Sequence, residues 1–253
     1  MQMVPNISHA DPLSVALLRF APVCSHDGVK TFRGVSPMSY VLFGISSSYV
    51  SEVVEILRRL AQPIDAFVAN VEAGDIPEDV GPVVRVAELR PAWLDEPVIV
   101  PLTTPGHRKS AVAHARALGF HRFPPVVDPT AIVASTVTMG EGTVVNAGAI
   151  IGAKTRLGPF VSVNRGVSVG HDVILEDFVS LGPSCVLGGF VRVLPGAYIG
   201  AGAVVLPNVT VGKNSVVGAG AVVVSEVPDR AVAVGNPARV IKTGGPGFNG
   251  VSV

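Results

Sequence analysis

A histidine and an aspartate stand side by side in the second half of the chain, at His171 and Asp172. Imidazole exchanges protons near neutral pH, so a histidine can remove the proton of an attacking amine or hydroxyl. A neighbouring carboxylate can fix the tautomer of the ring and raise its basicity. The pair is therefore a candidate general base for acyl transfer from a thioester. The alternative is that His171 is an exposed turn residue and that Asp172 pairs with Lys154, which lies 18 residues earlier.

The pair lies inside a six-residue repeat that determines how these side chains are placed. Every sixth residue from Val127 to Val223 is aliphatic or methionine, and a small or β-branched residue follows four places later. No insertion breaks this register. A period of six fits neither an amphipathic helix nor a flat strand, whose side chains repeat every ~3.6 and ~2 residues. It indicates a parallel β-helix in which three short strands and three corners make a coil of 18 residues.

The repeat predicts that the candidate side chains lie on corners of the β-helix. Gly or Asn often follows the aliphatic residue, as at Gly152, Asn164 and Gly170. We expect these residues to supply corner conformations that a larger side chain resists. Residues 18 apart should stack at the strand spacing of about 4.8 Å. Gly189 is therefore expected one coil above His171, with its backbone N–H open to a thioester or its oxyanion.

Four segments follow from the pattern along the chain. Residues 1–37 show no clear period and stay unassigned. In residues 38–124, strand-like and helix-like segments alternate, which predicts a small parallel α/β domain. Its strands and helices are expected at 40–44, 50–60, 65–69, 98–101 and 108–118. The β-helix is assigned to 125–228. Residues 229–253 are expected to be a C-terminal tail, disordered from Lys242 onward.

The composition excludes several classes of protein. Lys+Arg and Asp+Glu number 19 each, so no strong field attracts the chain to nucleic acid or an anionic membrane. Hydrophobic residues make up 48% and charged residues 15%, yet no apolar run is long enough to span a bilayer. The surplus must fill a large core or a subunit interface. The N-terminus lacks the pattern of a secretory signal, and Cys24 and Cys185 are too few for a disulfide framework. We therefore expect a cytoplasmic protein.

Residues 39–242 resemble the sialic-acid O-acetyltransferase and nucleotide-aminosugar N-acetyltransferase family of hexapeptide-repeat acyltransferases. Three stretches carry the resemblance: VNRGVSVGHDVILEDFVSLGPSCVLGGFV (163–191), IGAGAVVLPNVTVGKNSVVGAGAVV (199–223) and VGNPARVIK (234–242). In that family, a Rossmann-like α/β domain that binds a nucleotide sugar precedes a left-handed parallel β-helix. The resemblance therefore implies this fold class. It also implies a homotrimer, with each CoA cleft between two subunits.

The resemblance implies roles for individual residues as well. His171 falls on the family's catalytic base and Asp172 on its acidic partner. Gly189 and the corner Gly218-Ala219-Gly220 fall where backbone groups meet acetyl-CoA, and Asn164 falls beside the acceptor. The implied reaction is N-acetylation of a nucleotide-linked amino sugar for surface glycan biosynthesis. Acetyl-CoA donates the acetyl group directly, and no metal is required.

The chain departs from the family pattern at two sites. Ser180 replaces a second histidine nine places after the base, and its hydroxyl can position an acyl group or a water but cannot be an acid at neutral pH. The family's glycine-rich nucleotide loop, close to G-x-G-G-x-G, reads Gly44-Ile45-Ser46-Ser47-Ser48-Tyr49 here. We expect Gly44, Ser46 and Ser47 to contact the substrate at the start of a helix. The family's acidic pair after the second strand is Ala69-Asn70.

Alternative functions stay open at this point. The acceptor atom can be a sugar hydroxyl, or the acceptor can be a sugar or a small amino acid without a nucleotide. In a third alternative the β-helix is a scaffold without activity. A zinc carbonic anhydrase of the same fold needs several converging histidines, and only His171 lies in the repeat. That alternative fails.

Overall fold

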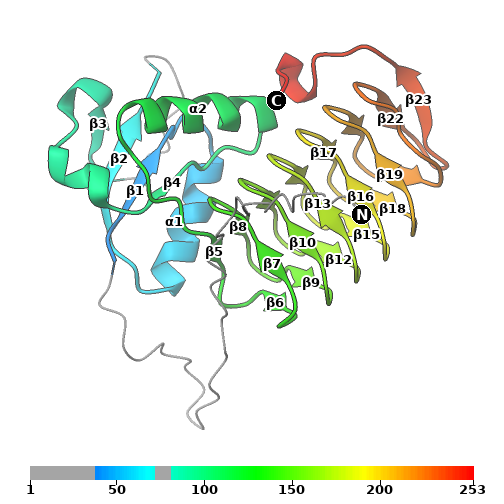
Figure 1. The fold of residues 1–253 in the computed structure, drawn as a ribbon, viewed down its shortest axis with the longest axis horizontal. Coiled ribbons are helices and arrows are strands. Elements are labelled where there is room, and N and C mark those ends of the chain that lie inside the picture. Colours follow the sequence, from blue (N-terminus) through cyan, green and yellow to red (C-terminus); the bar gives the residue numbers. More distant parts are fainter. Residues whose placement is uncertain (1–37, 72–80) are drawn as a thin grey trace, which may run out of the picture. The chain divides into compact units, whose positions relative to one another are not determined.

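The computed structural model describes residues 38–71 and 81–253. Its first part is a sheet of four parallel strands with two α-helices and two short 3₁₀ helices (Figure 1). The elements are β1 Tyr40–Phe43, α1 Tyr49–Arg59, β2 Ile64–Ala69, β3 Val83–Arg85, η1 Val86–Glu88, η2 Pro91–Asp95, β4 Val98–Ile99 and α2 Pro105–Ala117. The expected parallel α/β arrangement is confirmed.

The order of these strands creates a switch point in the sheet. The order is β3-β2-β1-β4, so β1 pairs with β2 on one side and with β4 on the other. All four residues of β1 are buried, as expected for a parallel strand that is covered on both faces. β3 was not predicted, because its three residues are partly exposed and show no alternation. In open parallel sheets, ligands bind beyond the carboxyl ends of the strands at such a switch point.

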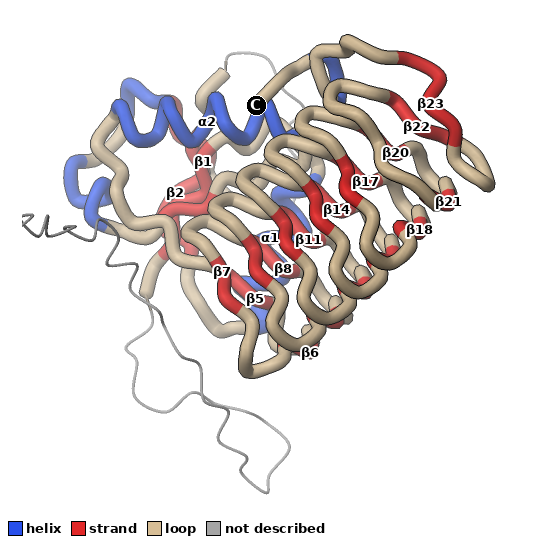
Figure 2. The backbone as a smooth tube through the Cα atoms, turned by 45° about the vertical axis from the view of Figure 1, so that its right-hand side comes forward, coloured by secondary structure: helices blue, strands red, loops and turns tan. Residues whose placement is uncertain are grey.

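The second part is a left-handed β-helix built from two-residue strands, which stack from coil to coil into three sheets (Figure 2). We name each sheet by its outer surface. Other parts of the chain cover much of the docked face, the aliphatic face exposes apolar side chains, and the polar face exposes polar and charged ones. The docked face consists of β5 Val126–Val127, β8 Val144–Val145, β11 Ser162–Val163, β14 Ser180–Leu181, β17 Tyr198–Ile199, β20 Val216–Val217, β22 Val232–Val234 and β23 Arg239–Lys242. The aliphatic face consists of β6 Ile132–Val133, β9 Ile150–Ile151, β12 Ser168–Val169, β15 Val186–Leu187, β18 Val204–Val205 and β21 Val222–Val223. The polar face consists of β7 Thr138–Met139, β10 Arg156–Leu157, β13 Ile174–Leu175, β16 Arg192–Val193 and β19 Thr210–Val211.

The register of the coils is the one that the sequence predicts. Val163 pairs with Leu181 and Val169 with Leu187, each 18 residues apart. The repeated aliphatic residues form one continuous core from Val145 onward, together with the small residues four places later. Cys185 is one of these small residues and is fully buried. The core is therefore a stack of nearly identical layers.

The glycines after the aliphatic residues do not have the role that the sequence suggested. The left-handed backbone conformation falls two residues later, for example at Lys154 with φ of 61° and at Asp172 with φ of 55°. Gly152 and Gly170 are instead needed because adjacent coils approach closely. A Cβ on Gly152 would lie 2.6 Å from the carbonyl carbon of Gly170. The expectation about corner conformation was wrong by two positions, and these glycines serve the stacking of coils.

The three outer surfaces of the β-helix differ in character. On the docked face, outward residues such as Val144, Ser162 and Ser180 are buried by other parts of the chain. The polar face carries Arg192, which bonds Glu176. The aliphatic face exposes apolar side chains along its length, the most exposed being Ile132, Ile150 and Val186, with Ser168 between the last two. An uncovered apolar patch of this kind is typical of an interaction surface.

The C-terminal residues are ordered in the structure, contrary to the expected disordered tail. β22 continues the docked face past Pro228, pairing Val232 with Val216, and β23 pairs antiparallel with β22 (Figure 1). Beyond Lys242 the chain turns back along the docked face. There the 3₁₀ helix η3, Phe248–Gly250, stacks the Phe248 ring on that of Tyr198, with 3.6 Å between centroids.

Candidate active site

The imidazole of His171 and the carboxylate of Asp172 form a direct contact at one corner of the β-helix. Nδ1 of His171 lies 2.9 Å from Oδ2 of Asp172. The histidine side chain is 59% exposed, and its second nitrogen, Nε2, has no hydrogen-bond partner among the described residues. No described lysine, Lys154 included, forms an ion pair with Asp172. When Nδ1–H donates a hydrogen bond to Asp172, Nε2 carries the free lone pair that a base needs.

Gly189 lies against the imidazole from the next coil. A Cβ built on Gly189 would come within 2.8 Å of Nε2 of His171, so glycine is the residue that leaves room for the ring. The backbone N–H of Gly189 donates to no other group in the described part of the chain. An unused donor thus stands in the same corner as the free imidazole nitrogen, as the sequence anticipated.

Phe190 is a neighbour of His171 that the sequence analysis missed. Its ring meets the imidazole edge to face, with 5.1 Å between centroids. The side chain is exposed, and the backbone is left-handed with φ of 61°, which is unusual for a bulky residue. Phe160 and Phe178 have the same left-handed conformation at their corners, but Phe160 is buried and Phe178 is partly buried, so Phe190 is distinguished by its exposure. Because phenylalanine recurs at these corners, nothing in the local sequence marks Phe190 as a neighbour of the histidine.

The predicted site residues that lie at corners of the β-helix fall into two groups. His171 and Gly189 lie between the aliphatic and polar faces, because they follow β12 and β15. Asn164 and the Gly218-Ala219-Gly220 segment lie between the docked and aliphatic faces, because they follow β11 and β20. A single chain therefore does not bring the two groups together. They flank the aliphatic face on its two sides.

A polar pocket joins the α/β domain to the second of these corners. Its volume is about 340 Å³, and it opens beyond the carboxyl ends of β1 and β4, at the switch point of the sheet. The lining residues are Ser47, Ser48, Tyr49, Glu52, Thr103, Asn164 and Arg165. Two predicted substrate-binding residues, Ser47 and Asn164, thus share one pocket. Ser46 does not line it, and Gly44 is buried with its N–H bonded to Val68 O at 2.9 Å.

Ser180 is buried under the α/β domain rather than exposed in a cleft. The residue is 2% exposed, and its hydroxyl donates to the carbonyl oxygen of Thr103 at 2.6 Å. It also accepts from the fully buried guanidinium of Arg108 at 2.9 Å. That guanidinium bonds further carbonyl oxygens, including those of Phe160 and Phe178, both at 2.9 Å. The position that holds a histidine in the family therefore holds, in this chain, a link between the β-helix and the loop that contains Thr103.

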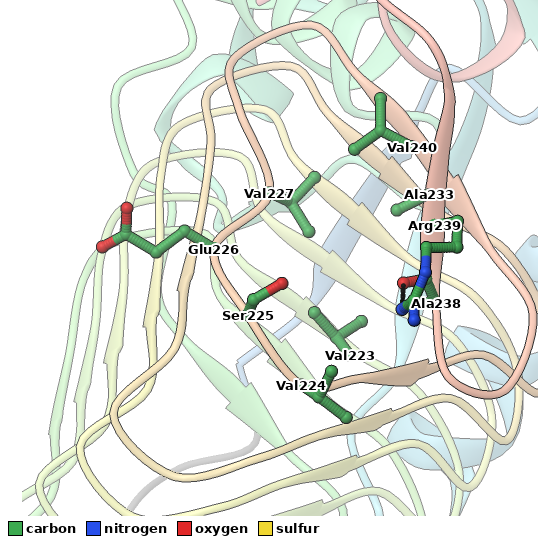
Figure 3. A pocket seen from close by; sticks show the side chains of 9 residues that line it. All are labelled: Val223, Val224, Ser225, Glu226, Val227, Ala233, Ala238, Arg239 and Val240. Carbon is green, nitrogen blue, oxygen red and sulfur yellow. Dashed lines mark hydrogen bonds between the residues drawn. The ribbon is translucent and has the colours of Figure 1, made fainter.

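A larger cavity, of about 500 Å³, lies at the C-terminal end of the β-helix (Figure 3). Val223, Val227, Ala233 and Ala238 line it and also belong to the β-helix core. The one carboxylate of the lining, Glu226, extends away from the other side chains (Figure 3). None of the predicted site residues lines this cavity. It is the open end of the core and carries no candidate catalytic group.

Two further properties of the described residues bear on function. No three side chains of His, Cys, Asp or Glu among residues 38–71 and 81–253 are grouped so that they could hold a metal ion. Within the same residues, no helix has the length and apolar character needed to cross a membrane.

Comparison with known proteins identifies a matching family and solved structures of similar fold. Residues 190–225 match the family described as bacterial transferase hexapeptide (six repeats). No curated protein sequence matches the chain. Among solved structures, a mutant of perosamine N-acetyltransferase from Caulobacter crescentus, in complex with CoA and GDP-perosamine, is 30% identical. Its TM-score is 0.70, and the match covers 83% of this chain and 98% of that chain. The mutant has asparagine in place of a single histidine.

Two other structures are similar over nearly the same length. The acetyltransferase domain of PglB from Neisseria gonorrhoeae, in complex with acetyl coenzyme A, is 28% identical with a TM-score of 0.72. That match covers 81% of this chain and 100% of that chain. WeeI from Acinetobacter baumannii, 24% identical with a TM-score of 0.69 and the same coverage, shares the fold.

Proposed function

Since the chain belongs to the sialic-acid O-acetyltransferase and nucleotide-aminosugar N-acetyltransferase family of left-handed β-helix acyltransferases, we propose that it N-acetylates a nucleotide-linked amino sugar. The family makes the chain a CoA-dependent acyltransferase. The choice of acceptor is supported by GDP-perosamine, the sugar bound in the Caulobacter relative. It is also supported by the pocket at the switch point, where a nucleotide would meet the start of α1.

The observation that carries the proposal is the contact between His171 and Asp172. Asp172 accepts a hydrogen bond from the Nδ1–H group, which leaves the lone pair of Nε2 free to act as a base. Nε2 takes a proton from the amino group of the sugar as its nitrogen attacks the thioester carbonyl. Acetyl-CoA supplies the activated acetyl group, and CoA leaves as its thiol after His171 returns the proton. The backbone N–H of Gly189 would stabilise the negative charge that develops on the thioester carbonyl oxygen during the attack.

The separation of the site residues supports a homotrimer. Asn164 and His171 flank the aliphatic face, and that face exposes Ile132 and Ile150. If aliphatic faces of neighbouring chains pack together, the His171 corner of one chain approaches the Asn164 corner of the next. Each site, with its acetyl-CoA against Gly218-Ala219-Gly220, would then be built from two chains. A single chain would hold only half of the required groups.

The test is thiol release from acetyl-CoA in the presence of nucleotide-linked and free amino sugars, with wild type and His171→Ala. We expect turnover with a nucleotide-linked amino sugar, reduced about 10²- to 10⁴-fold in the mutant. His121→Ala is the matched control, because His121 is an exposed histidine of the α/β part outside the site. It should keep the wild-type rate. A His171→Ala enzyme with most of its activity would contradict the mechanism.

The panel of acceptors also separates the alternatives. Turnover only with free sugars or other amines would assign a non-nucleotide acceptor, which the serine-rich loop Gly44–Tyr49 favours as second candidate. Acetylation of a hydroxyl would make the enzyme an O-acetyltransferase, and mass spectrometry of the product distinguishes an ester from an amide. CoA binding without turnover on any acceptor would favour a scaffold.

A further inference from the structure

An ion pair that the catalytic mechanism does not use crosses the pocket at the switch point. Glu52, on the first turn of α1, pairs with Nη1 of Arg165 on the β-helix corner. The second carboxylate oxygen of Glu52 accepts a hydrogen bond from Nδ2 of Asn146 at 3.2 Å. Asn146 is buried, so Glu52 is held from the β-helix side independently of Arg165. The carboxylate is therefore fixed, whereas the arginine is the partner that can move.

Most N–H donors of the Arg165 guanidinium have no acceptor within the described residues. A guanidinium carries five N–H groups, and within the described part of the chain only the one on Nη1 has an acceptor. The side chain is 54% exposed and lines the pocket. Guanidinium groups bind phosphate through pairs of parallel N–H bonds, which gives both strength and orientation. The remaining donors of Arg165 are thus available to an anion in the pocket.

The opposite wall of the pocket carries the Glu52 carboxylate and also the start of a helix. That helix is α1, which has 11 residues and carries partial positive charge at its N-terminus. Ser48 is its N-cap residue, and the Ser48 hydroxyl makes no capping bond. The Ser47 hydroxyl accepts a hydrogen bond from the N–H of Tyr49 at 3.3 Å, so one N–H group at the start of the helix is already used. An anion in the pocket would therefore depend on a cation from the other wall.

We propose that Arg165 binds the diphosphate of the nucleotide-linked acceptor, and that Glu52 is the carboxylate that the diphosphate displaces from it. The inference rests on the proposed function, since it assigns the phosphate-binding group of the same acceptor. It makes Arg165 a specificity-determining residue that separates nucleotide-linked sugars from free sugars. Glu52 weakens the binding of every anion in the pocket, because an anion must compete with it for the guanidinium.

The experiment measures binding by calorimetry, separately from acetyl transfer. The probes are inorganic pyrophosphate, GDP, UDP and dTDP, with guanosine and uridine as uncharged counterparts. Arg165→Ala should weaken the binding of the charged probes at least tenfold, and Arg165→Lys should restore part of it. Glu52→Gln should tighten it severalfold. Arg156→Ala is the matched control, because Arg156 is an exposed arginine on the polar face. It should bind like the wild type.

Kinetics with the nucleotide-linked amino sugar give a second readout. Arg165→Ala should raise KM for this acceptor with kcat nearly unchanged, and KM for a free amino sugar should stay the same. Equal affinity of wild type and Arg165→Ala for the charged probes would overturn the inference. So would weaker binding in Glu52→Gln, because the pair would then only hold α1 against the β-helix. Failure of the wild type to bind any charged probe would overturn it as well.

The inference and the proposed function can fail independently. If the charged probes bind as predicted but no nucleotide-linked sugar is acetylated, the binding site stands and the proposed reaction falls. If the reaction proceeds and Arg165→Ala keeps the wild-type KM, the reaction stands and the role of Arg165 falls. Thermal melting of each variant verifies that it is folded, and the conservative variants Arg165→Lys and Glu52→Gln preserve the size of the side chains.

Discussion

Nε2 of His171 faces Gly189 so closely that one methyl group on the glycine would lie 2.8 Å from it. The contact joins adjacent coils, so the position of the base is set by the stacking of the β-helix. The backbone of Gly189 is not left-handed. The only cost of a side chain there is therefore the collision with neighbouring atoms, chiefly those of the imidazole.

Gly189→Ala should push the imidazole out of place and lower kcat about 10- to 100-fold, because general-base catalysis needs hydrogen-bond reach to the proton. Because the imidazole is the far end of an exposed side chain and can swing aside, the loss of stability should stay below about 1 kcal/mol. Both effects follow from the His171 ring, so Gly189→Ala should cost almost no stability in a His171→Ala background. The double-mutant cycle is measured by urea unfolding, and kcat is measured by thiol release.

Gly245→Ala is the control for this cycle. A Cβ on Gly245 would meet its nearest neighbour, the carbonyl oxygen of Arg230, at an ordinary 3.5 Å. This variant should match the wild type in rate and stability. A Gly189→Ala enzyme with the wild-type kcat would show that the imidazole works equally well from another position.

Ile150→Glu should disrupt self-association. Ile150 is exposed on the aliphatic face, where a charge would be buried without a partner if two chains pack there. We expect light scattering to give three times the chain mass for the wild type and a smaller mass for the variant. Activity should fall with the loss of the trimer. Thr138→Glu, an exposed residue of the polar face, should change neither property. A wild type that is monomeric and fully active would contradict the two-chain site.

Arg108→Lys should destabilise the protein by about 3 kcal/mol or more, because an ammonium cannot reach the spread of acceptors that the guanidinium satisfies. Burial lowers the pKa of Arg108 to about 10, so the group stays charged at neutral pH. Its Nη1 donates to Leu102 O at 2.5 Å, and Nε donates to Phe160 O. Urea unfolding gives the change. Arg116→Lys, an exposed arginine of the same helix, should cost within about 0.5 kcal/mol. Equal costs would contradict the assigned role of Arg108.

Cys185 should make stability fall at high pH. Burial raises the pKa of the Cys185 thiol to about 12, from 9.0 for an ordinary cysteine. A thiol whose folded pKa is raised stabilises the protein fully below the unfolded pKa. That contribution is lost as the pH rises from about 9 to about 12. The loss is up to about 1.4 kcal/mol per pH unit.

Cys185→Ala isolates this effect, because Ala203 occupies the stacked position in the next coil. The difference in unfolding free energy between wild type and variant should shrink as the pH rises from 8 to 10. The measurement is urea unfolding in the presence of reductant, in a Cys24→Ser background. A difference that stays constant with pH would contradict the burial of the thiol as the cause.

The β-helix could be predicted from the sequence because its order is entirely periodic. Each inward residue, such as Val169 or Leu187, repeats the environment of the one 18 places earlier, so a single register explains the whole core. The strands and helices of the α/β part, except β3, could be predicted because the local sequence pattern of each one indicates a strand or a helix. The left-handed conformation was predicted at the wrong residue of each corner. Glycine is favoured both where adjacent coils approach closely and where the backbone is left-handed, so its presence does not distinguish the two.

Long-range packing could not be predicted. Ser180 has the outward position of a strand, and nothing local indicates that Thr103 and Arg108 cover it. The last residues are rich in glycine and have no period, yet Asn249 donates to Thr104 at 2.9 Å and the N–H of Val253 donates to Asn214 at 2.8 Å. At the candidate site, the contact of His171 with Asp172 follows from adjacency in sequence. The pocket between Glu52 and Arg165 depends on how α1 docks.

The docking of the last residues sets an order for folding. The coils of the β-helix close by pairing residues 18 apart, such as Val169 and Leu187, so they can form early and in any order. The bond between Asn249 and Thr104 spans 145 residues and requires both α2 and the coil around Asn214 to exist beforehand. Segment 248–253 can therefore attach only after the two halves of the molecule have assembled. Its hydrogen-exchange protection should be the last to appear during refolding.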